Sequence, residues 1–300
     1  MSLVSVRDIK NLLKRYKVHP LKRLGQIFLI DKGTIRKIIE AADLELEDVI
    51  LEIGPGLGTI TQEMAKKVKK IIGIEKDLKM TEILKETLKD CKNVEIVLGD
   101  ILKIENWKLK IKNYKVVANL PFYLTAPVIR QFLETIEPRP QQMVLVVQKE
   151  AAQRICAKPP EMSILAVSVQ FYAKPEIVIF VSKKSFWPQP KVDSAILRIN
   201  PLMTTDKKLI NTDLFFKVVR AGFSHPRKQL INNLSKEFLP AGRQGKLNRE
   251  EVKDWLLKNN IQPEQRAETL TVENWISLTR IAMKGEEEIY LFDYPNRNEG

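Results

Sequence analysis

Short apolar runs alternate with longer amphipathic segments along the first half of the chain. The apolar runs predict five strands, at residues 49–53, 70–75, 94–98, 115–118 and 142–148. Apolar residues at helical spacing between them predict helices at residues 61–68 and 78–88. Strands separated by helical segments form parallel sheets with helices on both faces. The pattern therefore predicts an α/β fold with a Rossmann-like, doubly wound, mostly parallel sheet.

The pattern differs at the two ends of the chain. Residues 4–16 have the spacing of an amphipathic helix, and Asp31 is placed to cap a second helix that carries Ile35 and Ile38. Two strand-like segments, 176–181 and 194–199, predict an antiparallel pair that closes the sheet. Helical segments follow at 214–221, 228–238, 250–258 and 272–283. We therefore predict a sheet domain at 1–203, a helical domain at 204–285 and an acidic tail at 286–300.

Positive charge is concentrated at the N-terminus. The 300 residues carry a formal charge of +13, and residues 1–37 alone hold ten Lys or Arg against two Asp. Such an excess favours a polyanionic partner, because lysines and arginines that neutralise phosphates release condensed counterions. By charge alone, this basic N-terminal arm fits a nucleic-acid contact and a solvated terminus of no function equally well, and the motifs below favour the contact.

Other composition features exclude several classes of protein. Cys91 and Cys156 have no spacing for a disulfide framework or a metal site. The sequence has neither a signal-peptide pattern nor an apolar stretch of the roughly 20 residues that a membrane span needs. We therefore expect a cytoplasmic protein that uses no metal and contacts no membrane.

The segment from Leu51 to Gly58 places three glycines between the first predicted strand and the next helix. Glycines there allow a tight turn that a ligand can approach closely, at the sheet edge where open α/β folds bind ligands. Glu75, 21 residues after Gly54, ends the second strand and can accept hydrogen bonds from a ribose. Asp100 ends the third strand and can accept from an adenine amino group, or alternatively cap a helix.

Two ligands fit these features, a nicotinamide dinucleotide or S-adenosylmethionine. The spacing G-x-G-x-G differs from the G-x-G-x-x-G that packs a helix onto a pyrophosphate, and it favours S-adenosylmethionine.

The string from Asn119 to Phe122 follows the fourth strand and distinguishes the two ligands. The Asn119 side chain and a carbonyl of Leu120 or Pro121 can accept both N–H groups of an adenine amine, which aims its lone pair at an activated methyl. Phe122 can stack on a base that has left its own stack. Hydride transfer would need a proton relay, which this string lacks. The site therefore predicts methyl transfer to an adenine amine.

Seven segments together carry a resemblance to a known family. They are 22–29 (KRLGQIFL), 52–58 (EIGPGLG), Glu75, 99–100 (GD), 119–121 (NLP), 186–195 (FWPQPKVDSA) and 223–230 (FSHPRKQL). With these segments the sequence resembles the ribosomal RNA adenine dimethyltransferases over nearly its whole length. The family dimethylates N6 of two adjacent adenines near the 3′ end of small-subunit ribosomal RNA.

The resemblance implies roles for particular residues. It implies S-adenosylmethionine as methyl donor, bound by Gln26, Leu29, Gly54, Gly56, Glu75, Asp100 and Asn119, and catalysis by Asn119, Leu120, Pro121 and Phe122. It also implies that Phe186 offers a second aromatic surface to the target base. Two positions depart from the family pattern: Ile27 stands where Asn is common, and Phe122 where Tyr is usual. Ile27 lacks the side-chain amide that could contact the donor, and Phe122 lacks the hydroxyl of the tyrosine, although its ring can still stack.

The resemblance also implies the partner. We expect a monomer that binds small-subunit ribosomal RNA or its precursor particle, with RNA contacts from Lys22, Arg23, Lys191, Arg227 and Lys228. Two alternatives remain. One is a large-subunit ribosomal RNA adenine methyltransferase that confers antibiotic resistance, in which Phe also occurs at position 122. The other is a non-catalytic relative that assists ribosome assembly or binds nucleic acid.

Overall fold

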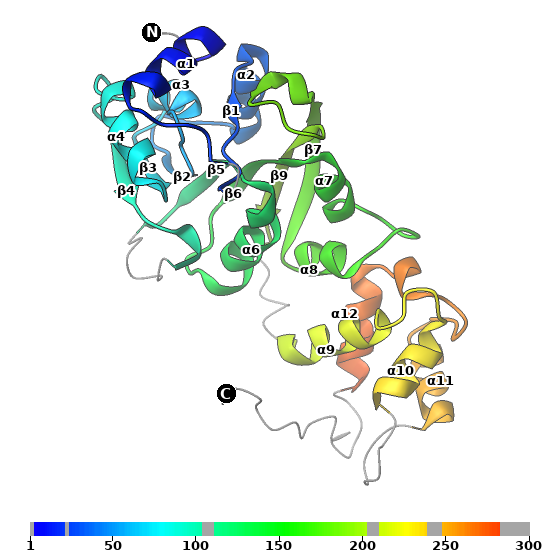
Figure 1. The fold of residues 1–300 in the computed structure, drawn as a ribbon. Helices are drawn as coiled ribbons and strands as arrows, with labels where there is room; N and C mark the ends of the chain where they lie inside the picture. The colour runs from blue at the N-terminus through cyan, green and yellow to red at the C-terminus, as the bar shows by residue number, and fades with distance from the viewer. Residues whose placement is uncertain (1–2, 22–23, 104–110, 203–209, 239–247, 283–300) are drawn as a thin grey trace, which may run out of the picture. The chain divides into compact units, whose positions relative to one another are not determined.

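The computed structural model describes residues 3–21, 24–103, 111–202, 210–238 and 248–282 (Figure 1). These residues form two compact units. The first comprises the chain up to residue 156 together with residues 172–202, and the second comprises residues 157–171 and the chain from residue 203. The sequence-based division after residue 203 placed residues 157–171 in the sheet domain, whereas in the structure they group with the C-terminal helices.

The first unit is built on a seven-stranded sheet. Its strands, in order across the sheet, are β4 (Val94–Leu98), β3 (Lys70–Glu75), β2 (Val49–Ile53), β5 (Tyr114–Asn119), β6 (Gln142–Gln148), β9 (Ser194–Pro201) and β7 (Ala173–Val181). The strands from β4 to β6 are parallel, while β9 runs antiparallel to both of its neighbours. The predicted α/β class and mostly parallel sheet are confirmed. The antiparallel pair is also found, but β9 lies between β6 and β7, so β7 forms the edge.

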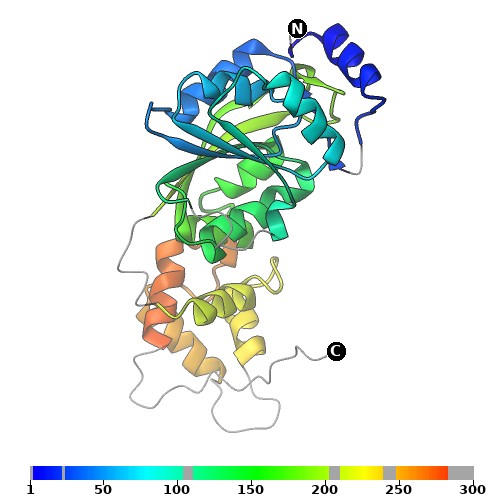
Figure 2. The same ribbon diagram turned by 90° about the vertical axis from the view of Figure 1, so that its left-hand side faces the viewer.

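Helices cover both faces of this sheet (Figure 2). One face carries α2 (Lys32–Ala42), α3 (Thr59–Ala65) and α4 (Leu78–Thr87), and the other carries α6 (Thr125–Arg130) and α7 (Lys149–Ile155). The predicted cap of α2 is present, because the Asp31 side chain accepts from the Thr34 amide at 2.6 Å. The short helices α6 and α7 were not predicted, because neither is long enough to show a helical period.

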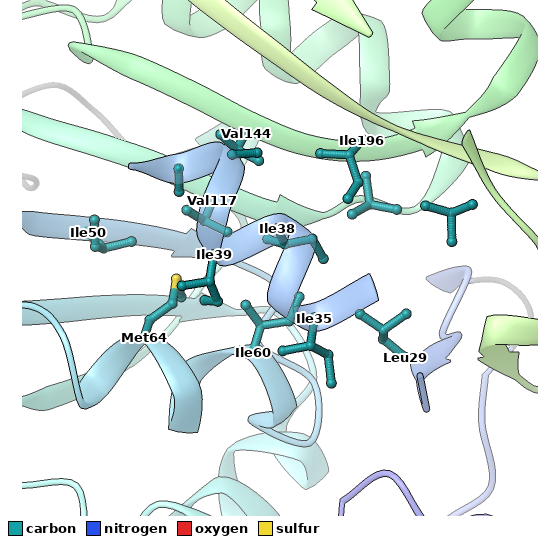
Figure 3. Close-up of a cluster of buried hydrophobic side chains, with 14 of the residues drawn as sticks. Leu29, Ile35, Ile38, Ile39, Ile50, Ile60, Met64, Val117, Val144 and Ile196 are labelled. Atoms are coloured by element: carbon teal, nitrogen blue, oxygen red, sulfur yellow. The ribbon is translucent and has the colours of Figure 1, made fainter. Parts of the chain in front are cut away.

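The core under α2 joins this helix to the strands of the sheet (Figure 3). Ile35, Ile38 and Ile39 of α2 are buried against side chains from α3 and the central sheet. Each fully buried side chain of this size contributes about 1.5–3 kcal/mol. This core therefore holds the carboxyl ends of the central strands, where the site lies, in a fixed arrangement.

The N-terminal helix α1 (Val6–Arg15) packs through Ile9, Leu12 and Leu13 against Leu57 and two residues of α4, with its basic side chains exposed. Strand β1 (Phe28–Leu29) pairs antiparallel with β8 (Phe186–Trp187) as a separate two-stranded sheet. The described part of the unit also contains the short helical turns η2 (Ile101–Lys103), η3 (Phe122–Leu124) and η5 (Lys183–Ser185) and a π-helical turn, η4 (Gln131–Thr135).

The regular elements described in the second unit are helices. They are α8 (Ile164–Tyr172), which begins in it, α9 (Thr212–Gly222), α10 (Leu230–Phe238), α11 (Arg249–Lys258), the turn η7 (Ala267–Thr269) and α12 (Val272–Ala282). Phe171 of α8 stacks on Phe215 of α9 with 4.1 Å between ring centroids, which explains why residues 157–171 join this unit. The predicted helical character of the C-terminal part is confirmed, and the predicted acidic tail lies outside the described residues.

Candidate active site

The glycine turn between β2 and α3 has the backbone that its sequence predicted. Gly54, Gly56 and Gly58 all have positive φ, at +68°, +59° and +83°. No heavy atom lies within 4 Å of the position that a Cβ would take at Gly54. Positive φ favours glycine, and the open space lets a ligand contact the backbone directly. The turn therefore leaves room for a ligand to lie across its glycines.

Glu75 ends β3 and holds this turn in place. Its two carboxylate oxygens accept from the Gly56 amide at 3.1 Å and the Asp77 amide at 2.9 Å. Burial raises the pKa of Glu75, and the two amide hydrogen bonds oppose that shift. Each oxygen retains a second lone pair, so the carboxylate can also accept from ribose hydroxyls.

Asp100 follows β4 and faces the neighbouring lysine. Its Oδ2 accepts from the Lys76 Nζ at 2.8 Å, and its Oδ1 accepts from the Leu102 amide at 3.1 Å. Although burial raises the pKa of Asp100, these hydrogen bonds and the lysine charge outweigh it and hold the pKa below the usual value. Asp100 thus caps the η2 turn and remains an ionised acceptor, so both roles considered from the sequence are compatible.

One pocket brings most of the predicted donor residues together. Its lining includes Gln26, Gly54, Gly56, Glu75, Asp100 and Asn119 from the predicted set. Other lining residues were not predicted as binding residues: Leu24, Ile53, Ile74, Lys76, Gly99, Ile101, Tyr123 and Leu124. Tyr123 has an exposed side chain and directly follows the Asn-Leu-Pro-Phe string. This position in the sequence was the one feature from which its place in the pocket could have been predicted.

Asn119 ends β5 at the pocket, and its side chain is held by the loop before β1. Its Nδ2 donates to the Ile27 carbonyl at 3.0 Å. Only the amide nitrogen can donate to a carbonyl, so Oδ1 remains available to accept from another group. The Ile27 side chain packs against the core under α2. Ile27 therefore orients Asn119 through its backbone, and the departure from the family's Asn leaves this contact unaffected.

The loop before β1 is itself fixed to the site. The Gln26 amide nitrogen donates to Asp77 Oδ2 at 2.7 Å, and its oxygen accepts from the Leu21 amide at 2.9 Å. Gly25 has φ +63°, and a Cβ there would stand 2.9 Å from the Cβ of Pro121. Gln26 thus lines the pocket, and its side-chain hydrogen bonds position the loop against the Asn-Leu-Pro-Phe string at 119–122.

Two residues expected at the site are buried elsewhere. Leu29 and Phe186 pair across β1 and β8, and each is 2% exposed in the core under α2. Leu29 does not line the donor pocket. A ring as buried as Phe186 presents almost no surface in this structure, and the stacking role implied by the resemblance stays a prediction. The antiparallel pairing of two apolar segments explains both positions.

The remaining residues of the Asn-Leu-Pro-Phe string differ in exposure. Leu120 is buried, and its amide donates to the Val146 carbonyl at 3.1 Å, which ties the string to β6. Pro121 lines the pocket, and its carbonyl accepts from the Leu124 amide at 2.9 Å. Phe122 is half-buried and begins the η3 turn without lining the donor pocket.

Beneath the glycine turn lies a buried acid that the sequence reasoning did not single out. Glu52 of β2 is 2% exposed and accepts from the Thr61 hydroxyl of α3 at 2.6 Å. Burial raises the pKa of Glu52 to about 8; the Thr61 hydrogen bond opposes this shift and the charge of Glu75 adds to it. Glu52 therefore carries a proton at neutral pH and links β2 to α3 on either side of the glycine turn.

This protonated acid predicts a pH effect on stability. The unfolded chain releases the Glu52 proton near pH 4.5 and the folded protein near pH 8, so the free energy of unfolding falls as pH rises between these values. We expect Glu52→Gln, which still accepts from Thr61, to remove this loss, on the order of 1 kcal/mol per pH unit. Urea unfolding of both proteins at about pH 5 and about pH 8 measures it. If wild type and Glu52→Gln differ in free energy of unfolding by the same amount at both pH values, Glu52 does not carry a proton at neutral pH in the folded protein.

The expected RNA-contacting residues are only partly described. Lys191 in the first unit and Arg227 and Lys228 in the second are exposed. Lys22 and Arg23 lie outside the described residues. Within the described ranges, no group of three or more His, Cys, Asp or Glu side chains is arranged to hold a metal ion. No described helix is both long and apolar enough to cross a membrane.

The family model described as "Ribosomal RNA adenine dimethylase" matches residues 19–278. The chain belongs to this dimethylase family. It is similar to proteins named "Ribosomal RNA small subunit methyltransferase A", with 40% identity to one from Dehalococcoides mccartyi over 90% of each chain. It is 38% identical to one from Alkaliphilus metalliredigens, over 93% of this chain and 97% of the relative.

Solved structures agree with the dimethylase assignment. A dimethyladenosine transferase from Plasmodium falciparum superimposes with a TM-score of 0.70 at 28% identity, covering 85% of this chain and 97% of that one. The 23S rRNA methyltransferase ErmE superimposes with a TM-score of 0.67 at 26% identity, covering 84% of this chain and 98% of that one. The family that the motifs indicated is therefore confirmed, and so is the methyltransferase fold of the sheet domain.

Proposed function

We propose that this dimethylase-family protein transfers methyl groups from S-adenosylmethionine to N6 of two adjacent adenines near the 3′ end of small-subunit ribosomal RNA. Each adenine would receive two methyl groups. The names of the similar small-subunit methyltransferases support the choice of RNA. The alternative of a non-catalytic relative is disfavoured because Glu75, Asp100 and Asn119 line one pocket.

The observation that carries the proposal is the arrangement of Asn119. Its Nδ2 is occupied by the Ile27 carbonyl, which leaves Oδ1 to accept one N–H of an adenine amine. A second acceptor is needed next to it, and the Leu120 carbonyl is better suited than that of Pro121. The Pro121 carbonyl already accepts from the Leu124 amide. Among the described residues, no backbone amide donates to the Leu120 carbonyl. Two fixed acceptors orient the amine, and positioning can supply much of the rate enhancement.

The pocket residues fit the proposed methyl donor. The turn at Gly54 offers open backbone, Glu75 offers acceptors for ribose hydroxyls, and Asp100 offers an ionised acceptor for an adenine amino group. The donor supplies a methyl group already activated on a sulfonium. The protein's part is to hold the adenine nitrogen in line with that methyl group through Asn119 and Leu120, with Phe122 or Tyr123 available to stack on the target base.

A second function is favoured by one similarity. The match to the large-subunit enzyme ErmE covers 84% of this chain. The sequence resemblance further implies that this class also has Phe at the position of Phe122. The two functions are separated by incubating the protein with labelled donor and either unmethylated small ribosomal subunits or free large-subunit RNA, followed by mapping of the modified base. We expect dimethylated adenines in the small subunit alone. Modification of the large-subunit RNA alone would favour the second function.

The basic arm offers a separate test of RNA binding. Arg7, Lys14 and Lys17 are exposed and form no ion pair within the described part of the chain. Changing all three to Gln should weaken RNA binding and lower the slope of log affinity against log salt, by roughly 0.7 for each phosphate that the arm no longer neutralises. Titration at several salt concentrations measures this slope.

A matched control removes as many positive charges elsewhere. Lys37, Lys66 and Lys69 each pair with a glutamate on the same unit, so their exchange for Gln should leave the slope nearly unchanged. Equal slopes for wild type and the Arg7, Lys14 and Lys17 variant would show that the arm does not contact RNA.

A further inference from the structure

The edge strand β7 exposes an aromatic ring near the end of the sheet that carries the active site. Phe180 is 48% exposed and is the penultimate residue of β7. Because β9 is antiparallel to both neighbours, β7 runs in the same direction as β6 and β5. The end of β7 therefore lies at the same sheet edge as Asn119, the last residue of β5.

One lysine lies against this ring, and three more lie on the chain segments beside it. The Lys149 Nζ lies 5.0 Å from the centre of the Phe180 ring. Asp193 brings the neighbouring loop to the same place: its carbonyl accepts from the Lys149 amide and its Oδ1 from the Lys183 amide, both at 3.0 Å. Lys184 follows in the same turn. We call Phe180 with Lys149, Lys183, Lys184 and Lys191 the Phe180 platform.

The lysines of the platform are not engaged in ion pairs: none of the four forms one among the residues that the structure describes. The acids nearest in the chain have other partners. Asp193 accepts from the Lys183 backbone amide, and Glu176 of β7 forms an ion pair with Arg198. Glu150 follows Lys149 on α7 and is exposed. The platform therefore presents an aromatic surface within a field of positive charge.

This combination identifies the chemical class of the partner. A single exposed phenylalanine is ordinary, and an apolar protein partner would not need four unpaired lysines beside it. Single-stranded nucleic acid offers a flat base to the ring and phosphates to the lysines, which is how proteins hold unpaired strands. Duplex RNA keeps its bases stacked inside, so it offers the ring no base to contact.

We propose that the Phe180 platform stacks an unpaired base of the RNA strand that holds the target adenine. The inference rests on the proposed function, because it places this base on the strand entering the active site. Three strand-to-strand steps separate β5 from β7, a distance of roughly 14 Å at about 4.8 Å per step. A few nucleotides of unpaired RNA can span that distance. The platform thus fixes the strand beside the pocket while Asn119 holds the target.

Binding and base stacking can be measured without catalysis. The probe is a short RNA hairpin with two adjacent unpaired adenines, in which the fluorescent base 2-aminopurine replaces each neighbouring unpaired base in turn. Stacking on Phe180 should quench the fluorescence at one position. We expect Phe180→Leu to lose this quenching and to bind about tenfold more weakly, and Phe180→Trp to retain both. Leu46→Ala, which removes an exposed side chain from a distant turn, is the control and should behave as wild type.

Two further measurements separate the possible outcomes. Exchange of Lys183 and Lys184 for Gln should lower the salt slope by roughly 1.4 while leaving the quenching in place. Donor affinity should be the same in all variants. Equal quenching and affinity for wild type and Phe180→Leu would overturn the platform. If wild type stacks the probe but methylates neither ribosomal RNA, the proposed function fails while the platform stands.

Discussion

Replacement of Asn119 by Ala is expected to lower the rate of methyl transfer by at least about 100-fold. The change removes the Oδ1 acceptor for the adenine amine, and loss of such an orienting group costs this much when positioning carries the catalysis. Donor affinity should change little, because the ribose and adenine of the donor are assigned to Glu75 and Asp100. Single-turnover methylation of small subunits, together with calorimetric titration of the donor, measures both quantities.

The variant Asn119→Asp tests separately whether the side chain at position 119 must be held in place and whether it must accept a hydrogen bond from the adenine amine. The carboxylate still accepts, but it cannot donate to the Ile27 carbonyl and so is no longer held in place. We expect a slow enzyme whose donor affinity falls less than that of Glu75→Ala. An Asn119→Ala variant as active as wild type would falsify the assigned mechanism.

Replacement of Glu75 by Ala is expected to have its main effect on donor affinity. The variant loses the acceptors for the ribose and the two hydrogen bonds that hold Gly56 and Asp77. Hydrogen bonds to charged groups contribute about 1.5–3 kcal/mol, so the dissociation constant should rise roughly 10- to 100-fold. Calorimetric titration measures it, and Glu95→Ala on β4, an exposed carboxylate paired with Lys70, is the matched control. If Glu75→Ala binds the donor as tightly as Glu95→Ala does, Glu75 is not a donor ligand.

The raised pKa of Glu75 gives this prediction a second readout. Since burial favours the neutral acid, Glu75 takes up a proton at a higher pH than an ordinary glutamate does. The protonated group has less acceptor capacity, so the donor affinity of the wild type should fall as pH is lowered through that pKa. Glu75→Gln has no proton to gain and should bind weakly with little dependence on pH in the same range.

Local sequence determined the framework of the site. The strands at 49–53, 70–75, 94–98 and 142–148 were predicted with the bounds that the structure has, because each is a short apolar run ended by polar or glycine residues. The pocket residues Gly54, Glu75, Asp100 and Asn119 come directly after or at the ends of such strands. Parallel strands bring their carboxyl ends to one edge, so strand bounds alone place these residues together.

Several positions could not be deduced from local sequence. Leu29 and Phe186 belong to motif segments, yet their pairing, 157 residues apart in the chain, buries both. The same is true of α8, an almost wholly apolar helix without a visible period, whose Phe171 stacks on Phe215 in the second unit. In each case the burial comes from a distant segment, and local spacing carries no information about it.

The sequence by itself determined that a glycine turn, two strand-ending acids and an Asn-Leu-Pro-Phe string would meet at one edge of the sheet. Only the tertiary structure decided how that site is held: the Ile27 carbonyl orients Asn119 across 92 residues, and Lys76 keeps Asp100 ionised. It also showed that Glu52 is buried beneath the turn and that Phe180 is exposed at the sheet edge among lysines. The physical reason is that strand periodicity is a local property, whereas hydrogen-bond partners, burial and surface charge depend on segments that meet only in the folded chain.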